Sequence, residues 1–322
     1  AVGYASLGAN TTGDQNVAVG ASAGLSVTTG IQNTLIGYLA GDALTNADYN
    51  TALGTSALTS DTLGSRAVAI GRNTLSSQNF TSATDNYNVA VGSSAGAQVT
   101  TGVNNTLIGG LAGDAITDQS NITAVGQSAL SANTSGQRGT AVGSAALASN
   151  TTGNYNTAFG FTALQNTTTA SNNTAVGYQS LDANTTASNN TAVGYDSLGA
   201  NTTGDGNTAM GAFALDSNTT GTQNVAVGGA ALDANTTASN NTAVGYYALL
   251  ANTTGTRNNA VGAVALDANT TGSYNNAFGY NSLGGNTTGA ENIAIGDNAL
   301  AANTTGANNT ALGTSSLFNN TT

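Results

Sequence analysis

An apolar residue followed by glycine recurs along the whole chain at a fixed spacing. The pair occurs in 19 copies, from Val2-Gly3 to Leu312-Gly313, and the glycines are 17 residues apart except for the 21 residues between Gly71 and Gly92. A typical unit, residues 173–189, reads Asn-Thr-Ala-Val-Gly-Tyr-Gln-Ser-Leu-Asp-Ala-Asn-Thr-Thr-Ala-Ser-Asn. A register held this long indicates a repeat architecture. Positions are counted below from this glycine, so that position −1 precedes it and position +1 follows it.

A unit of 17 residues is too short for a pair of helices and suits one coil of a β-solenoid. Val, Ile, Thr and Phe before the glycine favour a strand, and Asn-Thr-Thr-Gly favours a turn. Frequent Gly, Asn and Thr disfavour helices. The sequence therefore predicts an all-β parallel solenoid of about 19 coils, each with two short strands and two turns, stacked about 4.8 Å apart.

The residue at position −1 is apolar in all 19 copies. It shares a strand face with position −3, which holds mostly Thr or Val, because side chains alternate along a strand. We therefore predict that these two positions form the core. Position +4, which is Leu in 15 copies, is expected to complete that core. It is Gly in the other four copies: Gly24, Gly41, Gly96 and Gly113.

Position −2 lies on the opposite strand face and is Ala in 17 copies, with Leu35 and Leu107 as the exceptions. A solvent-facing position is expected to vary, as position +1 does, so the constancy of Ala indicates close packing against another surface. The simplest such surface is a second copy of the chain. The sequence thus predicts a parallel homotrimer with contacts at Ala175, Ala192, Ala209 and Ala226.

Asparagine recurs at position −4, as in Asn16 and Asn156, and again at the start of the turn, as in Asn184 and Asn201. Stacked identical Asn side chains can hydrogen-bond from coil to coil, so ladders are the favoured interpretation. Two alternatives stay open: glycan attachment at Asn-Thr-Thr, and ice binding by rows of Thr.

The chain is expected to be one continuous solenoid, residues 1–322, cut from a longer protein because it begins and ends inside a unit. Residues 1–126 contain variant coils with a duplicated block, in which 16–54 resembles 88–126, and residues 127–322 contain regular coils. A four-residue insertion lies within 76–87. Its Phe80 is a candidate ligand contact, with a tolerated surface bulge as the alternative.

Composition excludes several classes of chemistry. The chain has no His, Cys, Pro, Trp or Lys, so it has no Ser-His-Asp triad, Cys nucleophile, Schiff-base lysine or ordinary zinc site. Four Arg in a chain of net charge −11 make nucleic acid an unsuitable partner. No apolar run approaches the roughly 20 residues of a membrane helix. We therefore expect no enzymatic activity, no cofactor, no metal and no membrane insertion of this segment.

Aspartate and tyrosine, which each recur at a fixed position of the repeat, are candidates for further chemistry. Asp182, Asp216, Asp233 and Asp267 share position +5. They are expected to be solvated surface acids, although neighbouring carboxylates could instead act as acid and base or hold Ca²⁺. Tyr178, Tyr195 and Tyr246 share position +1 and are candidate ligand contacts, because a stripe of Tyr could stack on sugars. Ordinary surface strand propensity explains the tyrosines equally well.

The Val-Ala-Val-Gly and Ile-Ala-Ile-Gly strands, at 17–20, 89–92 and 293–296, resemble the head repeats of trimeric autotransporter adhesins. The longer unit, as at 241–255, resembles repeats in the shafts of phage tail fibres. These resemblances imply a left-handed parallel β-roll assembled as a homotrimer. They imply a structural, extracellular role, foremost as a virion tail fibre that presents a tip binding a host receptor or glycan. The alternatives are a bacterial surface adhesin that binds host matrix or glycan and, third, an ice-binding solenoid.

Overall fold

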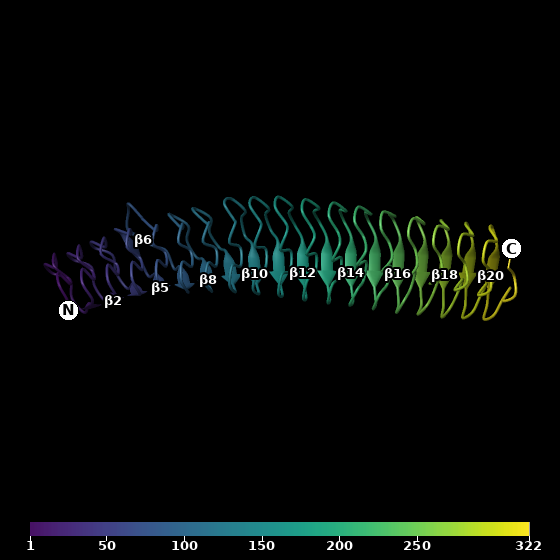
Figure 1. Cartoon of the computed structure of the whole chain (residues 1–322), viewed down its shortest axis with the longest axis horizontal. Helices are drawn as coiled ribbons and strands as arrows, with labels where there is room; N and C mark the ends of the chain where they lie inside the picture. The colour runs from purple at the N-terminus through teal and green to yellow at the C-terminus, as the bar shows by residue number, and fades with distance from the viewer. Residues whose placement is uncertain (322) are drawn as a thin grey trace. The chain divides into compact units, whose positions relative to one another are not determined.

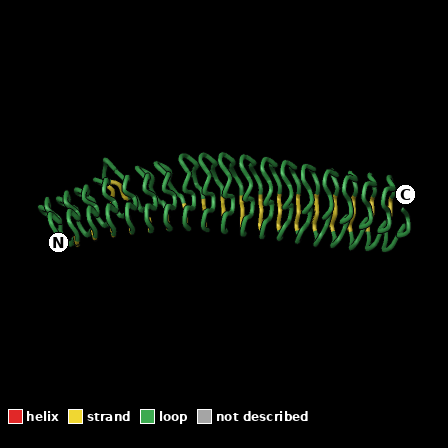
Figure 2. Tube along the Cα trace, viewed as in Figure 1, coloured by secondary structure: helices red, strands yellow, loops and turns green. Residues whose placement is uncertain are grey.

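A computed structural model describes residues 1–321 and shows an all-β parallel solenoid with coils of about 17 residues and about 17–18 turns (Figure 1). Strands and turns account for this described part, in which no residue is helical (Figure 2). The first copy forms only a bridge from Val2 to Val19, so fewer turns result than the 19 copies predicted. The predicted all-β parallel solenoid with 17-residue coils is confirmed. The chain divides into two compact units, Ala1–Phe161 and Thr162–Thr322, which are described separately.

The strands of the first unit form one parallel sheet, apart from the short pair β4 and β6. Their bounds are β1 (Val17–Val19), β2 (Thr34–Ile36), β3 (Thr51–Leu53), β4 (Gly64–Ser65), β5 (Val68–Ile70), β6 (Thr84–Asp85), β7 (Val89–Val91), β8 (Thr106–Ile108), β9 (Thr123–Val125), β10 (Thr140–Val142) and β11 (Thr157–Phe159). Pairing is in register with the repeat, so that Ala141 of β10 pairs with Ala158 of β11.

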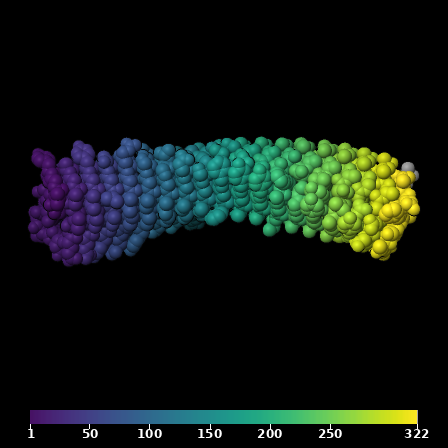
Figure 3. Space-filling view, turned by 60° about the horizontal axis from the view of Figure 1, so that its bottom comes forward, coloured from purple at the N-terminus to yellow at the C-terminus, as the bar shows by residue number. Residues whose placement is uncertain are grey.

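The second unit repeats this arrangement with nine strands and no insertion. They are β12 (Thr174–Val176), β13 (Thr191–Val193), β14 (Thr208–Met210), β15 (Val225–Val227), β16 (Thr242–Val244), β17 (Asn259–Val261), β18 (Asn276–Phe278), β19 (Ile293–Ile295) and β20 (Thr310–Leu312). Each strand pairs with its neighbour in parallel, with Ala175 against Ala192 and Ala192 against Ala209. In the space-filling view, neighbouring coils of each unit pack directly on one another (Figure 3).

Each regular coil contains one three-residue strand, and within residues 1–321 the predicted second strand occurs only in the two coils that hold the short pair β4 and β6. In the other coils its place is taken by turns with left-handed residues. In one coil of the second unit, Gln179 and Leu181 have φ values of 54° and 52°, which a strand does not accommodate. Hydrogen bonds still join these turns from coil to coil, as from the N–H of Leu181 to the carbonyl of Ser197. The leucine at position +4 is therefore a buried turn residue rather than a strand residue.

The two faces of the strand are the reverse of the prediction. Ala175, Ala192, Ala209 and Ala226 are fully buried inside their own chain. Positions −1 and −3 face outward, and Val176 is 36% exposed. The prediction that these four alanines contact another chain is therefore wrong. The interior of a single-chain coil is narrow, so the inward position opposite a leucine accepts little more than a methyl group.

The two leucines at position −2 show how tightly this interior is packed. A Cβ placed on Gly24 or Gly41 would lie 2.7 Å from a methyl group of Leu35. The same relation joins Leu107 to Gly96 and Gly113, at 2.6 and 2.8 Å. The glycines at position +4 thus make room for a leucine at position −2, and the core keeps its volume by exchanging the two positions.

The glycine that defines the repeat is required by the close approach of neighbouring coils. Gly177 has a φ of 142°, and a Cβ built on it would lie 2.2 Å from the carbonyl oxygen of Gly194. A side chain there would push two coils apart, so only glycine allows the stack to close.

Buried asparagines form the predicted ladders. At position −4, Oδ1 of Asn190 accepts the backbone N–H of Asn207 at 2.8 Å. At position +7, Nδ2 of Asn201 donates to Oδ1 of Asn184 at 3.3 Å, and Asn218 donates to Asn201 at 2.9 Å. This second ladder continues coil by coil to Asn320. Within residues 1–321, Nδ2 of Asn190 and Nδ2 of Asn309 are the ladder nitrogens that are buried without a partner. The hydrogen bonds of the other ladder amides stabilise these polar side chains in the interior of the solenoid.

The insertion within 76–87 is anchored by a buried carboxylate. Asp61 occupies the ladder position and is fully buried. Its Oδ1 accepts the N–H groups of Gly64 and Phe80 at 3.1 and 3.0 Å, and its Oδ2 accepts from Gln78 at 2.7 Å. Phe80 is only 6% exposed, so the prediction that its ring contacts a ligand is wrong. The ring is used to cover the core beneath the inserted residues.

Exchange of volume between positions −2 and +4 can be tested with a double-mutant cycle. Ala192→Leu should lower the free energy of unfolding by about 1–3 kcal/mol through overpacking, and Leu198→Gly should lower it by leaving a cavity. The double variant should be more stable than the sum predicts, by about 0.5–3 kcal/mol. Denaturant unfolding monitored by circular dichroism measures all three. Strict additivity would contradict the exchange, and Val193→Leu on the outer face is the control that should change little.

The hydrogen bonds around Asp61 at the insertion predict that replacing its carboxylate by an amide lowers the stability of the fold. Asp61→Asn would place an NH₂ group against the Gln78 amide nitrogen, because Oδ1 must still accept two N–H groups. Gln78 cannot simply rotate, since its Oε1 accepts from Asn88 at 2.8 Å. We expect a loss of about 1–3 kcal/mol, measured by thermal unfolding. Asp48→Asn, at a half-buried position whose acceptor oxygen is retained, provides the comparison, and an equal effect at both sites would refute the argument.

Candidate functional site

Positions −3 and −1 of each coil form the outer face of the strands, called here the outer sheet face. Position −1 is Val, Ile, Leu, Phe or Met in every copy, and none of these side chains is buried within the chain. In the second unit, Met210 and Phe278 are 45% and 41% exposed. A single apolar residue on a surface is ordinary, but a row of them is a feature that interaction surfaces typically have.

Exposed aromatic side chains lie beside this face. Tyr178, Tyr195 and Tyr246 are all exposed, as a ligand contact would require. The rings of Tyr178 and Tyr195 stack on each other, with centroids 5.3 Å apart and planes 5° from parallel. Tyr195 also meets the edge of Phe213 at 5.1 Å. Since the two tyrosines cover one another, they do not present a row of open ring faces, and their role as ligand contacts stays a prediction.

The aspartates at position +5 are half-buried rather than fully solvated. Burial raises the pKa of Asp182, Asp233 and Asp267. Burial, followed by repulsion from Asp196 and Asp233, raises the pKa of Asp216 to about 6. The prediction of solvated surface acids therefore needs correction. Within this column Asp216 and Asp233 are one coil apart, and the charge of Asp233 disfavours the ionised form of Asp216.

The carboxylates of this column do not converge as a metal site would. Near Gly199, the Oδ1 atoms of Asp196 and Asp216 lie 2.8 and 2.7 Å from where a Cβ would be, but Asp196 is at position +2, so only Asp216 belongs to the column. Across residues 1–321, no three His, Cys, Asp or Glu side chains are grouped so that they could hold a metal ion. The Ca²⁺ and acid–base alternatives for this column gain no support from the geometry.

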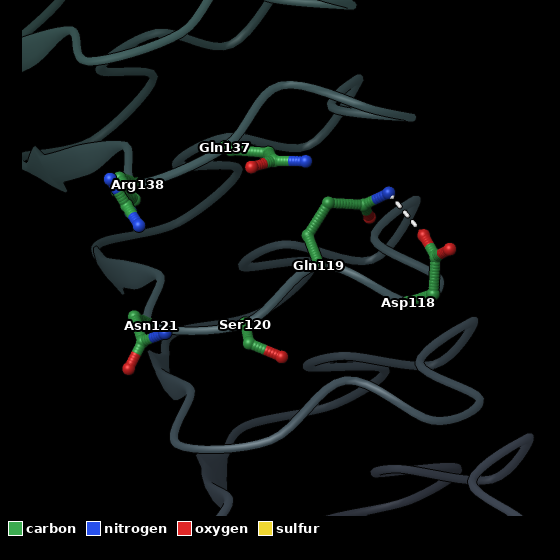
Figure 4. A pocket seen from close by; sticks show the side chains of 6 residues that line it. All are labelled: Asp118, Gln119, Ser120, Asn121, Gln137 and Arg138. Atoms are coloured by element: carbon green, nitrogen blue, oxygen red, sulfur yellow. Dashed lines mark hydrogen bonds between the residues drawn. The ribbon is translucent and has the colours of Figure 1, made fainter.

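A polar groove lies on a turn of the first unit, between two neighbouring coils (Figure 4). Its volume is about 230 Å³, and its lining residues are Asp118, Gln119, Ser120, Asn121, Gln137 and Arg138. Ser120 and Asn121 belong to one coil, and Gln137 and Arg138 face them from the next (Figure 4). Gln119 and Asp118 close one end, joined by a 2.6 Å hydrogen bond from the amide to the carboxylate.

The turn at the groove differs from the turns on either side of it at position −6. In the coil before it, the backbone N–H of Val103 donates to the hydroxyl of Ser120 at 3.0 Å. In the coil after it, the N–H of Gln137 donates to Oδ1 of Asn154 at 2.8 Å. Between them, the longer Gln137 side chain forms no such bond to the N–H of Ser120. The N–H of Ser120 therefore lacks the coil-to-coil hydrogen bond that the neighbouring turns have.

Sequence reasoning missed this groove, although a signal was present. Position −7 is Gly or Ala in every copy except for Asp85, in the inserted coil, and Gln119. The side chain of Gln119 is 93% buried and reaches the carbonyl of Thr134 at 2.9 Å. The adjoining ladder position is Ile122 rather than Asn. Two departures in one coil of a regular repeat indicate a local change of surface.

Comparisons with known proteins do not identify a family. No protein-family model matches the sequence, and no curated protein is detectably similar to it. Nowhere in residues 1–321 is there a helix long and apolar enough to cross a membrane. The site must therefore be interpreted from its own geometry and chemistry.

The raised pKa values of the aspartate column predict a specific pH dependence. Between about pH 4 and pH 6 the folded chain binds more protons at Asp216 than the unfolded chain, since its pKa rises from 3.8 to about 6. Stability should therefore increase as the pH falls from 7 to 5. Asp216→Asn should raise the melting temperature at pH 7 and weaken this dependence. Asp14→Asn, an exposed acid outside the column, is the control, and a melting temperature that falls between pH 7 and 5 would contradict the prediction.

Proposed function

We propose that the chain is a structural, non-enzymatic segment of a fibre, and that copies of it associate through the outer sheet face. The observation that carries the proposal is the outward row of apolar residues at position −1. Position +1, one residue beyond the glycine, ranges from Arg72 to Gly110 and Tyr178. Solvent exposure alone would let position −1 vary in the same way. Burial against another chain explains why it does not.

A parallel homotrimer is the assembly that we propose. A rotation axis parallel to the stacking direction brings each coil of one copy level with the same coil of the others, so every outward Val, Ile, Leu or Phe meets its own equivalents. A long repeat then forms one continuous apolar seam. The resemblance to trimeric adhesin heads and tail-fibre shafts supports three chains and left-handed winding.

The proposed setting is an extracellular virion tail fibre, in which this segment spaces and presents a part that binds a host receptor or glycan. The absence of His, Cys and Lys from the sequence supports a role without enzymatic chemistry. A bacterial surface adhesin is the alternative, since it uses the same kind of shaft. The flanking genes and sequence distinguish them: a baseplate-attachment region supports a fibre, and a signal peptide with a membrane barrel supports an adhesin.

One observation favours a second candidate function, ice binding. Threonines at position −3, such as Thr174, Thr191 and Thr208, face outward one coil apart on the paired strands β12 to β14. This is a more regular array than the turn threonines supply. The bulky Phe159, on the first unit, and Met210 interrupt the flatness that an ice surface requires. Measurement of thermal hysteresis tests this function directly.

The association face can be tested by adding charge to it. Val193→Asp with Val227→Asp should convert a trimer, of three times the 31.2 kDa chain mass, to monomers, because two carboxylates per chain would have to be buried at the seam. Both positions face outward, so the coil should stay folded. Light scattering coupled to size-exclusion chromatography gives the mass, and circular dichroism gives the fold.

Thr186→Asp with Thr220→Asp adds the same charge at exposed turn positions and is the matched control, which should remain trimeric. A parent chain that is monomeric at micromolar concentration would refute the self-association. A charged outer face that leaves the trimer intact would refute the assignment of the contact surface.

A further inference from the structure

The polar groove at 118–138 has an unusual balance of hydrogen-bonding groups. In the part of the chain that the structure describes, the side-chain amides of Asn121 and Gln137 have no hydrogen-bond partner, although each can donate and accept. The N–H of Ser120 is also unbonded at this edge. The guanidinium of Arg138 has one long contact, 3.4 Å to the hydroxyl of Tyr155. Donors and acceptors thus alternate around a small open space (Figure 4).

The groove is held in place by groups that are themselves fixed. Gln119 is 93% buried, and its amide donates to Asp118 and to the carbonyl of Thr134 while its oxygen accepts the N–H of Thr117 at 2.9 Å. One carboxylate oxygen of Asp118 is engaged by this amide, and the other is left to accept. Arg138 lies over the ring of Tyr155, with its guanidinium carbon 5.6 Å from the centroid. Both charged ends of the groove are therefore positioned before any ligand arrives.

We propose that this groove binds one ring of a neutral saccharide. A sugar carries adjacent hydroxyls that each donate and accept, which matches amides that do both, a carboxylate that only accepts and a guanidinium that only donates. The charges of Asp118 and Arg138 compensate each other, so a neutral ligand leaves no unpaired charge. A volume of about 230 Å³ is below the roughly 300–1,000 Å³ of pockets for drug-sized ligands, and suits a single ring.

This inference goes beyond the proposed fibre, because a purely structural segment needs no ligand. The groove lies at positions −7 to −5 and on the preceding turn, outside positions −3 and −1 of the outer sheet face. Binding in the groove and association through that face are therefore separate properties. A monomeric chain that still binds sugar would refute the proposed trimer and support the proposed sugar site. A trimer that binds no sugar would refute the sugar site and support the trimer.

The test replaces two residues of the groove by those that regular coils have at the same positions. Gln137→Ser with Arg138→Asn introduces the residues that other coils carry at positions −6 and −5, as in Ser188 and Asn189. The serine can accept the N–H of Ser120 and close the groove, so the fold should be kept. Saturation-transfer NMR and calorimetry on the full chain, with glucose, galactose, mannose and N-acetylglucosamine as probes, should show binding of at least one sugar by the parent. The variant should bind it about tenfold more weakly or not at all, since charge-assisted hydrogen bonds are lost.

A matched control uses the regular turn of the second unit that also has an arginine at position −5. Thr256→Ser with Arg257→Asn removes that arginine from a coil whose position −6 is already short, and should bind sugar as the parent does. Melting temperatures at or above the parent's confirm that both variants are folded. Equal binding by the parent and the Gln137→Ser, Arg138→Asn variant would overturn the proposal. So would the absence of binding by every sugar, or binding only of a zwitterion such as free glycine, which tests whether the two charges select a charged ligand instead.

Discussion

The in-register parallel stack is the constraint on which the rest of the structure depends. Each residue lies against its own equivalent one coil away, as Ala192 does between Ala175 and Ala209. A residue type is therefore acceptable only if it packs or hydrogen-bonds well with itself. Alanine meets this condition in a narrow interior, and asparagine meets it because its side chain both donates and accepts. Aspartate does not: burial, followed by repulsion from Asp196 and from its stacked equivalent Asp233, raises the pKa of Asp216.

Much of the fold could be predicted from the sequence because the repeat itself carries the information. The 17-residue period fixed the coil, and the recurrence of Asn16 and Asn184 at two positions indicated the ladders. The strand face was assigned wrongly, because an alternating pattern does not say which side is inside and the larger apolar side chains suggested position −1. The deciding signal was the pairing of Leu35 with Gly24 and Gly41, which only residues in mutual contact would show.

Local departures from the period were harder to predict than the period. Phe80 looked exposed because it lies in an insertion, yet the carboxylate of Asp61 draws the inserted backbone inward and the ring covers the core. The predicted second strand failed at Leu181, whose left-handed backbone has no signature in composition. The groove depends on the length of the Gln137 side chain, which replaces a short acceptor. Each case depends on how neighbouring coils contact one another, and the pattern of residues within one coil does not predict those contacts.

The asparagine ladder at position +7 gives the second unit a net dipole along the direction in which its coils stack. From Asn201 to Asn320 each amide nitrogen donates backward to the carbonyl oxygen of the preceding coil, so all the amide dipoles point the same way. Aligned dipoles add, as they do along an α-helix, and chains of hydrogen bonds polarise one another. The stack therefore has a positive end towards Asn184 and a negative end towards Asn320.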